Sequence, residues 1–289
     1  MVALETHSPH KTLPKFNSLL PRTHSMVAPL YWVGLALLII SIPTLALTLL
    51  DGRQLQGVSV WLKPFKFQIS TGVYLLTLAL FMVWLPAQAL RTKKARYVVW
   101  SAVISGLFEV AYITVQGSLG LASHYNLSSR FFANMYTLMG IGAVVLVSAS
   151  LVLGILIARS QNYELPAPLK LAVVLGLILT FVIGTGFGGY LSAQRAGHWV
   201  GGVLSDSGGL PLVKWSRSGG DLRVAHFFGI HAMHFIPAFA FALHLAGTKQ
   251  MAQMTQTRAV KAVWIFAIAF TGFCTWTFVQ ALRGLPFLA

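Results

Sequence analysis

The sequence predicts an all-α polytopic membrane protein with about seven transmembrane helices in one bundle. Of its 289 residues, 56% are hydrophobic and 9% are charged, whereas a soluble domain carries about 25% charged residues. The mean hydropathy is +0.73. Hydrophobic residues gather in stretches that reach the roughly 20 residues needed to cross a bilayer. The predicted spans are 30–50, 67–84, 97–116, 132–158, 169–192, 224–246 and 260–282, and we expect residues 30–289 to form a single transmembrane domain.

Residues 1–29 differ in character from the spans that follow. Lys11, Lys15 and Arg22 stand against Glu5, prolines recur, and there is no apolar core segment. A cleavable signal peptide needs such a segment before its cleavage site. The composition therefore predicts a basic, flexible N-terminal tail followed by a true span.

The first span, 30–50, contains no charged residue, but the start of the second is ambiguous. Its apolar character begins near Val58 and includes Lys63, Pro64 and Lys66. This leading segment either belongs to the span or lies along the membrane interface.

Glu109 is an acidic residue well inside a predicted span, the third. This span runs toward the face opposite the N-terminal tail, which puts Glu109 about 10 Å below that face. Two interpretations stay open. Glu109 forms a structural pair with Lys66, Arg130 or a histidine, or it belongs to a proton-transfer or ligand site.

The fourth span, 132–158, is uncharged, and the fifth ends in a glycine-rich segment. Gly184 and Gly188 are spaced for close contact between helices. Because these glycines end a helix rather than follow a strand, they do not indicate a nucleotide-binding site. The loop after them, 193–222, is rich in glycine and includes Trp199 and Trp215. It is either a lid or a connector at the interface, and Asp221 is expected to cap the next helix.

The sixth span carries the most informative pattern, four histidines at 226, 231, 234 and 244. Ionisable groups at membrane depth are costly and usually functional, although a buried imidazole can simply hydrogen-bond across helices. His226 should lie near the surface, with His231 and His234 about 8 and 12 Å deeper. A kink is expected at Pro237, which lacks the amide hydrogen of a regular helix.

His231 and His234 are neighbours three positions apart and can share a metal ion or a proton path. On a regular helix His226 is too far along the axis to join them. Its expected partners therefore lie in the loops and are His124, His198 and Asp221. In the seventh span Cys274 stands alone, and without a CxxCH motif covalent haem c is excluded.

The net charge of +15 does not indicate nucleic-acid binding. The basic residues lie singly or in small groups between spans, where they set orientation and contact anionic lipid, and no nucleic-acid-binding motif accompanies them. The tail and the even-numbered loops hold 12 Lys and Arg against 9 on the other side. This count predicts a cytoplasmic N-terminus and a periplasmic C-terminus.

The segments GGDLRVAHFFGIHAMH at 219–234 and WLKPFKF at 61–67 resemble those of bacterial polytopic inner-membrane proteins. The resemblance implies a bacterial inner-membrane location. It brings no activity and no catalytic residues with it.

Three hypotheses for function remain. The first is a membrane redox protein with non-covalent haem b or a transition metal, acting on a quinone or small molecule. Its cofactor-binding candidates are His226, His231, His234, His198 and His124, with His231 and His234 as metal ligands. The second is a proton-coupled small-molecule transporter in which Glu109 and His234 transfer protons. The third is a scaffold or assembly factor without chemistry.

Overall fold

The computed structural model describes residues 25–161, 165–194, 197–249 and 256–289. Most of the predicted tail, 1–29, lies outside these residues. The long helices are α2 (Ala28–Leu50), α3 (Leu62–Met82), α5 (Lys93–Ser118), α6 (Arg130–Arg159), α7 (Ala167–Ser192), α9 (Ala232–Lys249) and α10 (Gln256–Leu282), and the shorter ones are α4 (Ala87–Leu90) and α8 (Arg223–Ile230).

The predicted all-α polytopic fold is confirmed. Within the described residues six helices are long and apolar enough to cross a membrane, and α8 with α9 makes a seventh span if the bent pair counts as one. Neighbouring helices pack in chain order, α2 on α3, α3 on α5, α5 on α6 and α6 on α7. Helix α7 then packs on α8 and α9, and α10 contacts all three.

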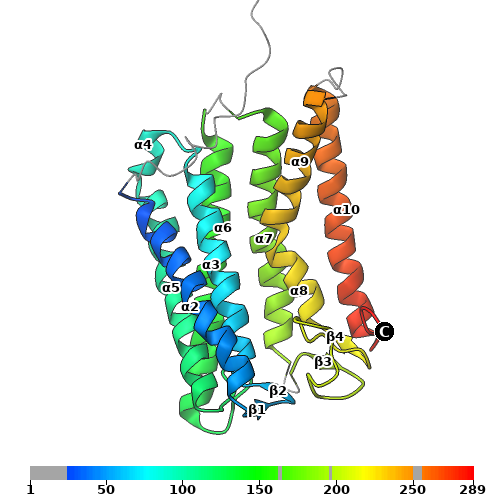
Figure 1. The fold of residues 1–289 in the computed structure, drawn as a ribbon. Coiled ribbons are helices and arrows are strands. Elements are labelled where there is room, and N and C mark those ends of the chain that lie inside the picture. The colour runs from blue at the N-terminus through cyan, green and yellow to red at the C-terminus, as the bar shows by residue number, and fades with distance from the viewer. Residues whose placement is uncertain (1–24, 162–164, 195–196, 250–255) are drawn as a thin grey trace, which may run out of the picture.

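Two short antiparallel ribbons lie at one end of the bundle together with the C-terminus, while α4 lies at the other end (Figure 1). They are β1 (Gln54–Leu55) with β2 (Val58–Ser59), and β3 (Trp199–Val200) with β4 (Gly220–Asp221). We call these ends the ribbon end and the α4 end. Tyr125 donates a hydrogen bond to the carbonyl of Leu191 there, which ties the α5–α6 loop to the end of α7. The α5–α6 loop and the end of α7 therefore lie together at the ribbon end.

The structure resolves the ambiguous start of the second span. Helix α3 begins at Leu62, so Lys63, Pro64 and Lys66 lie in its first two turns. The preceding residues form the β1–β2 turn, in which Gln56 and Gly57 have φ of 55° and 80°. Two consecutive left-handed residues are the geometry of a tight hairpin turn, which is why α3 can follow so closely.

The predicted kink of the sixth span at Pro237 is wrong in position. The helix breaks at His231, the two halves meet at 53°, and Pro237 lies inside α9. At the break, Thr180 on α7 accepts a hydrogen bond from the amide of Met233 at 2.9 Å. It also donates to the carbonyl of Ile230 at 3.5 Å. The hydroxyl thus satisfies backbone groups that the break leaves without helical partners.

The predicted close contact at Gly184 and Gly188 is confirmed. A methyl group at Gly184 would lie 2.8 Å from the side chain of Ile230, and one at Gly188 would lie 2.8 Å from the ring of His226. Both neighbours belong to α8, so these glycines let α7 and α8 approach closely.

Candidate functional site

His231 and His234 are in direct contact, as their spacing predicts. Their Nδ1 atoms are 3.2 Å apart and their ring centroids 5.1 Å apart. His231 caps the end of α8 and His234 lies in the first turn of α9. The pair therefore sits at the break of a spanning helix, where a backbone bend and two imidazoles coincide.

The hydrogen bonds around Thr77 on α3 fix the tautomers of both rings. Thr77 donates its hydroxyl hydrogen to the carbonyl of Val73 at 2.8 Å, so its oxygen accepts from His234 Nε2 at 3.0 Å. Nδ1 of His234 then carries a lone pair and accepts from Nδ1 of His231. The result is a directed chain from His231 through His234 to Thr77, which we call the histidine chain.

Glu109 is buried on α5, with 4% of its surface exposed. Its Oε1 has no hydrogen-bond partner in the described part of the chain, and this oxygen lies so close to Gly142 on α6 that a methyl group there would be 2.8 Å away. Within the described residues the predicted ion pair of Glu109 with Lys66, Arg130 or a histidine is not formed. Its Oε1 lies against the backbone of α6 at Gly142.

Two polar residues on the same face of α5 were missed by the sequence analysis. The hydroxyl of Tyr112 and Oε1 of Gln116 are buried and, in the described residues, have no hydrogen-bond partner. They follow Glu109 by three and seven positions, so all three lie along one helix face over about 10 Å. The spacing from Glu109 is the signal that would have found them. This face is a column of buried oxygen atoms leading toward the ribbon end.

His226 lies against α7 rather than among the loops. Its Nδ1 is 3.2 Å from the carbonyl oxygen of Gly184, and this contact is possible because Gly188 leaves room for the ring. Since a carbonyl only accepts, Nδ1 carries the hydrogen and Nε2 carries the lone pair.

The expected loop partners of His226 are engaged elsewhere. His124 bonds to Ser123, His198 to Asp206 and Asp221 to Arg223. This prediction was wrong because the sequence does not show that the carbonyl of Gly184 on α7 lies level with His226 along the bundle. His124 is nevertheless near by, since burial, together with Lys63 and His226, holds its pKa well below the usual value.

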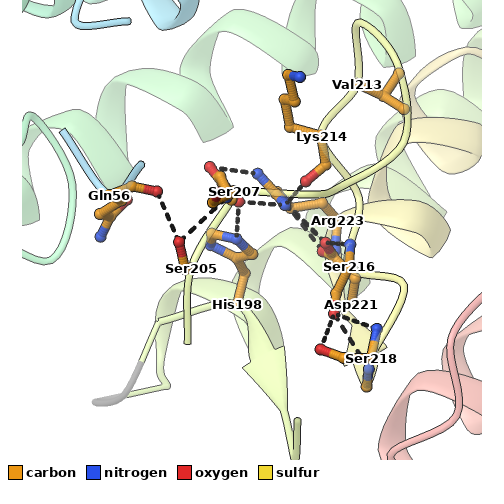
Figure 2. A network of polar contacts seen from close by, with 12 residues as sticks. Gln56, His198, Ser205, Ser207, Val213, Lys214, Ser216, Ser218, Asp221 and Arg223 are labelled. Carbon is orange, nitrogen blue, oxygen red and sulfur yellow. Dashed lines mark hydrogen bonds and ion pairs between the residues drawn. The ribbon is translucent and has the colours of Figure 1, made fainter. Parts of the chain in front are cut away.

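Arg223, at the start of α8, is the centre of a charged network at the ribbon end (Figure 2). Its guanidinium lies 2.7 Å from Asp221 and 2.8 Å from Asp206, and it donates to the carbonyl of Lys214 at 2.6 Å. Asp206 also contacts His198 at 3.3 Å. We call these four side chains, at 198, 206, 221 and 223, the Arg223 network.

The network fixes the loop between α7 and α8 in place. The amide of Asp206 donates to the carbonyl of Gln56 in the β1–β2 turn, and Asp221 belongs to β4. Asp221 also accepts from the amide of Arg223 at 3.0 Å, so its predicted capping role is carried out one position before the N-cap, Leu222. These contacts hold the described part of the loop over the ribbon end of the bundle. Arg223, which makes most of them, was not predicted.

Charges within the network shift the titration of its loop members. Burial opposes ionisation of Asp206, but the hydrogen bond with His198 and the charge of Arg223 hold its pKa below the usual value. Burial also lowers the pKa of His198, against the effect of Asp206. An ionised Asp206 beside a neutral His198 follows.

The donor set does not amount to a metal site of the usual kind. Within the described ranges no three His, Cys, Asp or Glu side chains converge so as to hold a metal ion. Zinc and similar ions take three or four protein ligands, and His231 and His234 supply two. The predicted metal ligands are adjacent, but among the described residues a third ligand does not join them.

Helix length, apolar surface and buried ionisable groups together define the class, a polytopic α-helical membrane protein. Comparison with protein-family models, curated proteins and solved structures finds no match.

Proposed function

We propose that this protein is a proton-coupled membrane transporter of a small molecule, with protons passing along the histidine chain. The observation that carries the proposal is the directed hydrogen-bonded line from His231 through His234 to Thr77. A neutral imidazole that receives a proton on one nitrogen can release one from the other. Two imidazoles in contact at membrane depth therefore form a relay.

The break between α8 and α9 supports this proposal. Discontinuous spanning helices are typical of transporter binding sites, because they place backbone and side-chain polar groups at the membrane midplane. Here Thr180 satisfies the backbone of the break, so the bend does not leave those groups unpaired. The histidine chain also connects α9 to α3, two helices that are far apart in the sequence.

Glu109 is the second proton carrier in this proposal. Tyr112 and Gln116 continue its helix face toward the ribbon end, and their buried oxygen atoms have no hydrogen-bond partner among the residues that the structure describes. Such a column suits water molecules that carry protons inward. In the orientation that the basic residues favour, within a bacterial inner membrane, the ribbon end faces the periplasm and protons enter there.

The test is proton flux into proteoliposomes that contain an internal pH-sensitive dye, driven by a potassium diffusion potential and measured with a panel of small organic and inorganic solutes supplied outside. The wild type should acidify the lumen faster than empty liposomes. Glu109→Gln and His234→Gln should slow the flux at least tenfold. His244→Gln is the matched control, because His244 lies on the same helix α9 about 15 Å further along.

Two outcomes contradict the proposal. A wild-type protein without flux above that of empty liposomes favours a scaffold role. Flux that survives in both Glu109→Gln and His234→Gln removes the proposed relay. Correct folding of each variant is established by its elution as a single species in detergent.

A membrane redox protein is the second candidate, and the geometry of His226 favours it. A histidine that donates Nδ1–H to a backbone carbonyl presents its Nε2 lone pair in the orientation of a metal or haem ligand, and His226 does this toward Gly184. His124 would be the second histidine to hold haem b, which would supply electron transfer, and a quinone would be the partner. Oxidised and dithionite-reduced spectra of the purified protein test this. A haem band that disappears in His226→Gln supports it, and a colourless wild type opposes it.

A further inference from the structure

Lys63 and Lys66 are two half-buried cations at the start of α3 that form no ion pair with any residue that the structure describes. In the described residues every ion pair uses Asp51, Asp206 or Asp221, and none includes either lysine. A lysine ammonium group at membrane depth is costly unless a negative charge or water compensates it. Two of them, one turn apart on the same helix, call for an explanation.

Lys66 does not extend outward to the headgroups as an end lysine usually does. Its Nζ lies 3.3 Å from the carbonyl of Val213, in the α7–α8 loop that covers the ribbon end and is clamped by the Arg223 network. Lys66 therefore points beneath this cover.

Lys63 also faces the bundle. Its Nζ lies 5.9 Å from the centre of the Phe67 ring, and it is close enough to His124 to influence that ring electrostatically. Its charged neighbours include Lys66, Arg223, Asp206 and Glu109.

The balance of charge around the two lysines is positive. Arg223 and the two aspartates are already committed to one another at 2.7 and 2.8 Å. Glu109 makes no ion pair within the described residues. The first turn of α3 adds to the positive potential, because its N-cap, Trp61, provides no side-chain acceptor for the free amides. Positive charge in a covered, apolar setting attracts an anion.

We propose that Lys63 and Lys66 bind the anionic group, a carboxylate or a phosphate, of the small molecule that this protein carries. This inference rests on the proposed transport function and names its substrate class, small organic or inorganic anions. Proton binding on Glu109 or the histidine chain would then accompany the anion and offset its charge. An anionic lipid headgroup offers the same chemistry and is the alternative source of the ligand.

The experiment is thermal unfolding of the purified full chain in neutral detergent, titrated with inorganic phosphate and, separately, with succinate at constant ionic strength. The wild type should show a saturable rise in Tm of several degrees with at least one of them. The double variant Lys63→Gln/Lys66→Gln should need at least tenfold more anion. Lys94→Gln, an exposed lysine on α5 at the α4 end, should behave as the wild type.

A second arm separates the two sources of anion. The protein is placed in nanodiscs of phosphatidylglycerol or of phosphatidylcholine. A lysine-dependent rise in Tm confined to phosphatidylglycerol assigns the site to a lipid headgroup and contradicts the substrate assignment. No saturable effect of phosphate or succinate in the wild type, or an equal effect in the double variant, overturns the inference. Lys63→Arg/Lys66→Arg keeps the charges and should retain binding, which guards against a folding defect.

Binding and proton flux fail independently. Anion binding that persists in a protein without flux overturns the transport proposal but leaves an anion site. Flux that persists without lysine-dependent binding overturns the anion site and leaves the transport proposal standing.

Discussion

The Arg223 network and the group formed by Glu109, Lys63 and Lys66 lie in neighbouring parts of the molecule. They differ in whether their charged side chains form ion pairs. In the network each charge has a partner within 2.8 Å. In the second group, within the described residues, none of the three side chains forms an ion pair. Paired charges hold a structure in one arrangement. Unpaired charges at membrane depth are suited to binding an ion or a proton that comes and goes.

The two groups also depend on each other. The Arg223 network clamps the α7–α8 loop, and the same loop supplies the Val213 carbonyl that contacts Lys66. The paired region thus positions the cover over the unpaired one. We therefore expect substitutions in the Arg223 network mainly to lower stability, and substitutions of Glu109, Lys63 or Lys66 mainly to impair function.

The largest expected effect is that of Arg223→Met. It leaves Asp206 and Asp221 buried without a counter-ion, which typically costs about 3–5 kcal/mol of unfolding free energy. Thermal unfolding in detergent measures the loss. Arg53→Met is the control, because Arg53 pairs with Asp51 at 2.6 Å but is 53% exposed, and screening makes such pairs weak. Equal losses in the two variants would break the comparison.

The sequence predicts the spans well because hydrophobicity is a local property. Six of the seven stretches each match one long helix, and the sixth is divided between α8 and α9. The sequence also predicts the contact between His231 and His234, since a three-residue spacing brings side chains together in any helical turn. It does not predict the site of the break. Pro237 is a local signal, but the backbone breaks where Thr180, some fifty residues earlier, offers a hydroxyl.

The Arg223 network could not be predicted from the sequence for a similar reason. Asp206 meets Arg223 across 17 positions of irregular loop, and no periodicity describes such a contact. By contrast, Tyr112 and Gln116 follow Glu109 at helical spacing and were predictable. The sequence does not show which positions of distant segments lie side by side in the folded protein.

The second prediction concerns the backbone at the break between α8 and α9, outside both regions. Thr180→Val removes the acceptor of the Met233 amide and leaves a buried N–H unsatisfied, which costs about 1–3 kcal/mol. Thr180→Ser keeps the hydroxyl and should stay close to the wild type. Unfolding free energies of the three proteins measure this. A valine variant as stable as the serine variant would show that the break does not need this hydroxyl.

The third prediction concerns the pH dependence of stability that His124, in the α5–α6 loop, causes. Its folded-state pKa lies below the usual 6.5, so both states are neutral well above this pH and stability there is constant. Below about pH 6.5 the unfolded chain binds a proton that the folded protein resists. The unfolding free energy then falls by at most about 1.4 kcal/mol per pH unit.

The variant His124→Gln should therefore lose less stability than the wild type between pH 7 and pH 5. Unfolding in detergent at a series of pH values measures the two slopes. Identical slopes would mean that His124 takes up a proton as easily in the folded protein as in the unfolded chain, and that burial and the neighbouring charges do not lower its pKa.

The smallest expected change in stability is that of Glu109→Gln, and it tests the comparison most sharply. The amide has nearly the shape of the carboxyl group, and no ion pair in the described residues is lost, so the unfolding free energy should change by less than about 1 kcal/mol. Proton flux should nevertheless fall at least tenfold. If instead Glu109→Gln destabilises the protein as strongly as Arg223→Met, then Glu109 is a structural charge with a strong partner. In that case the separation of a clamped region from a proton-carrying one does not hold.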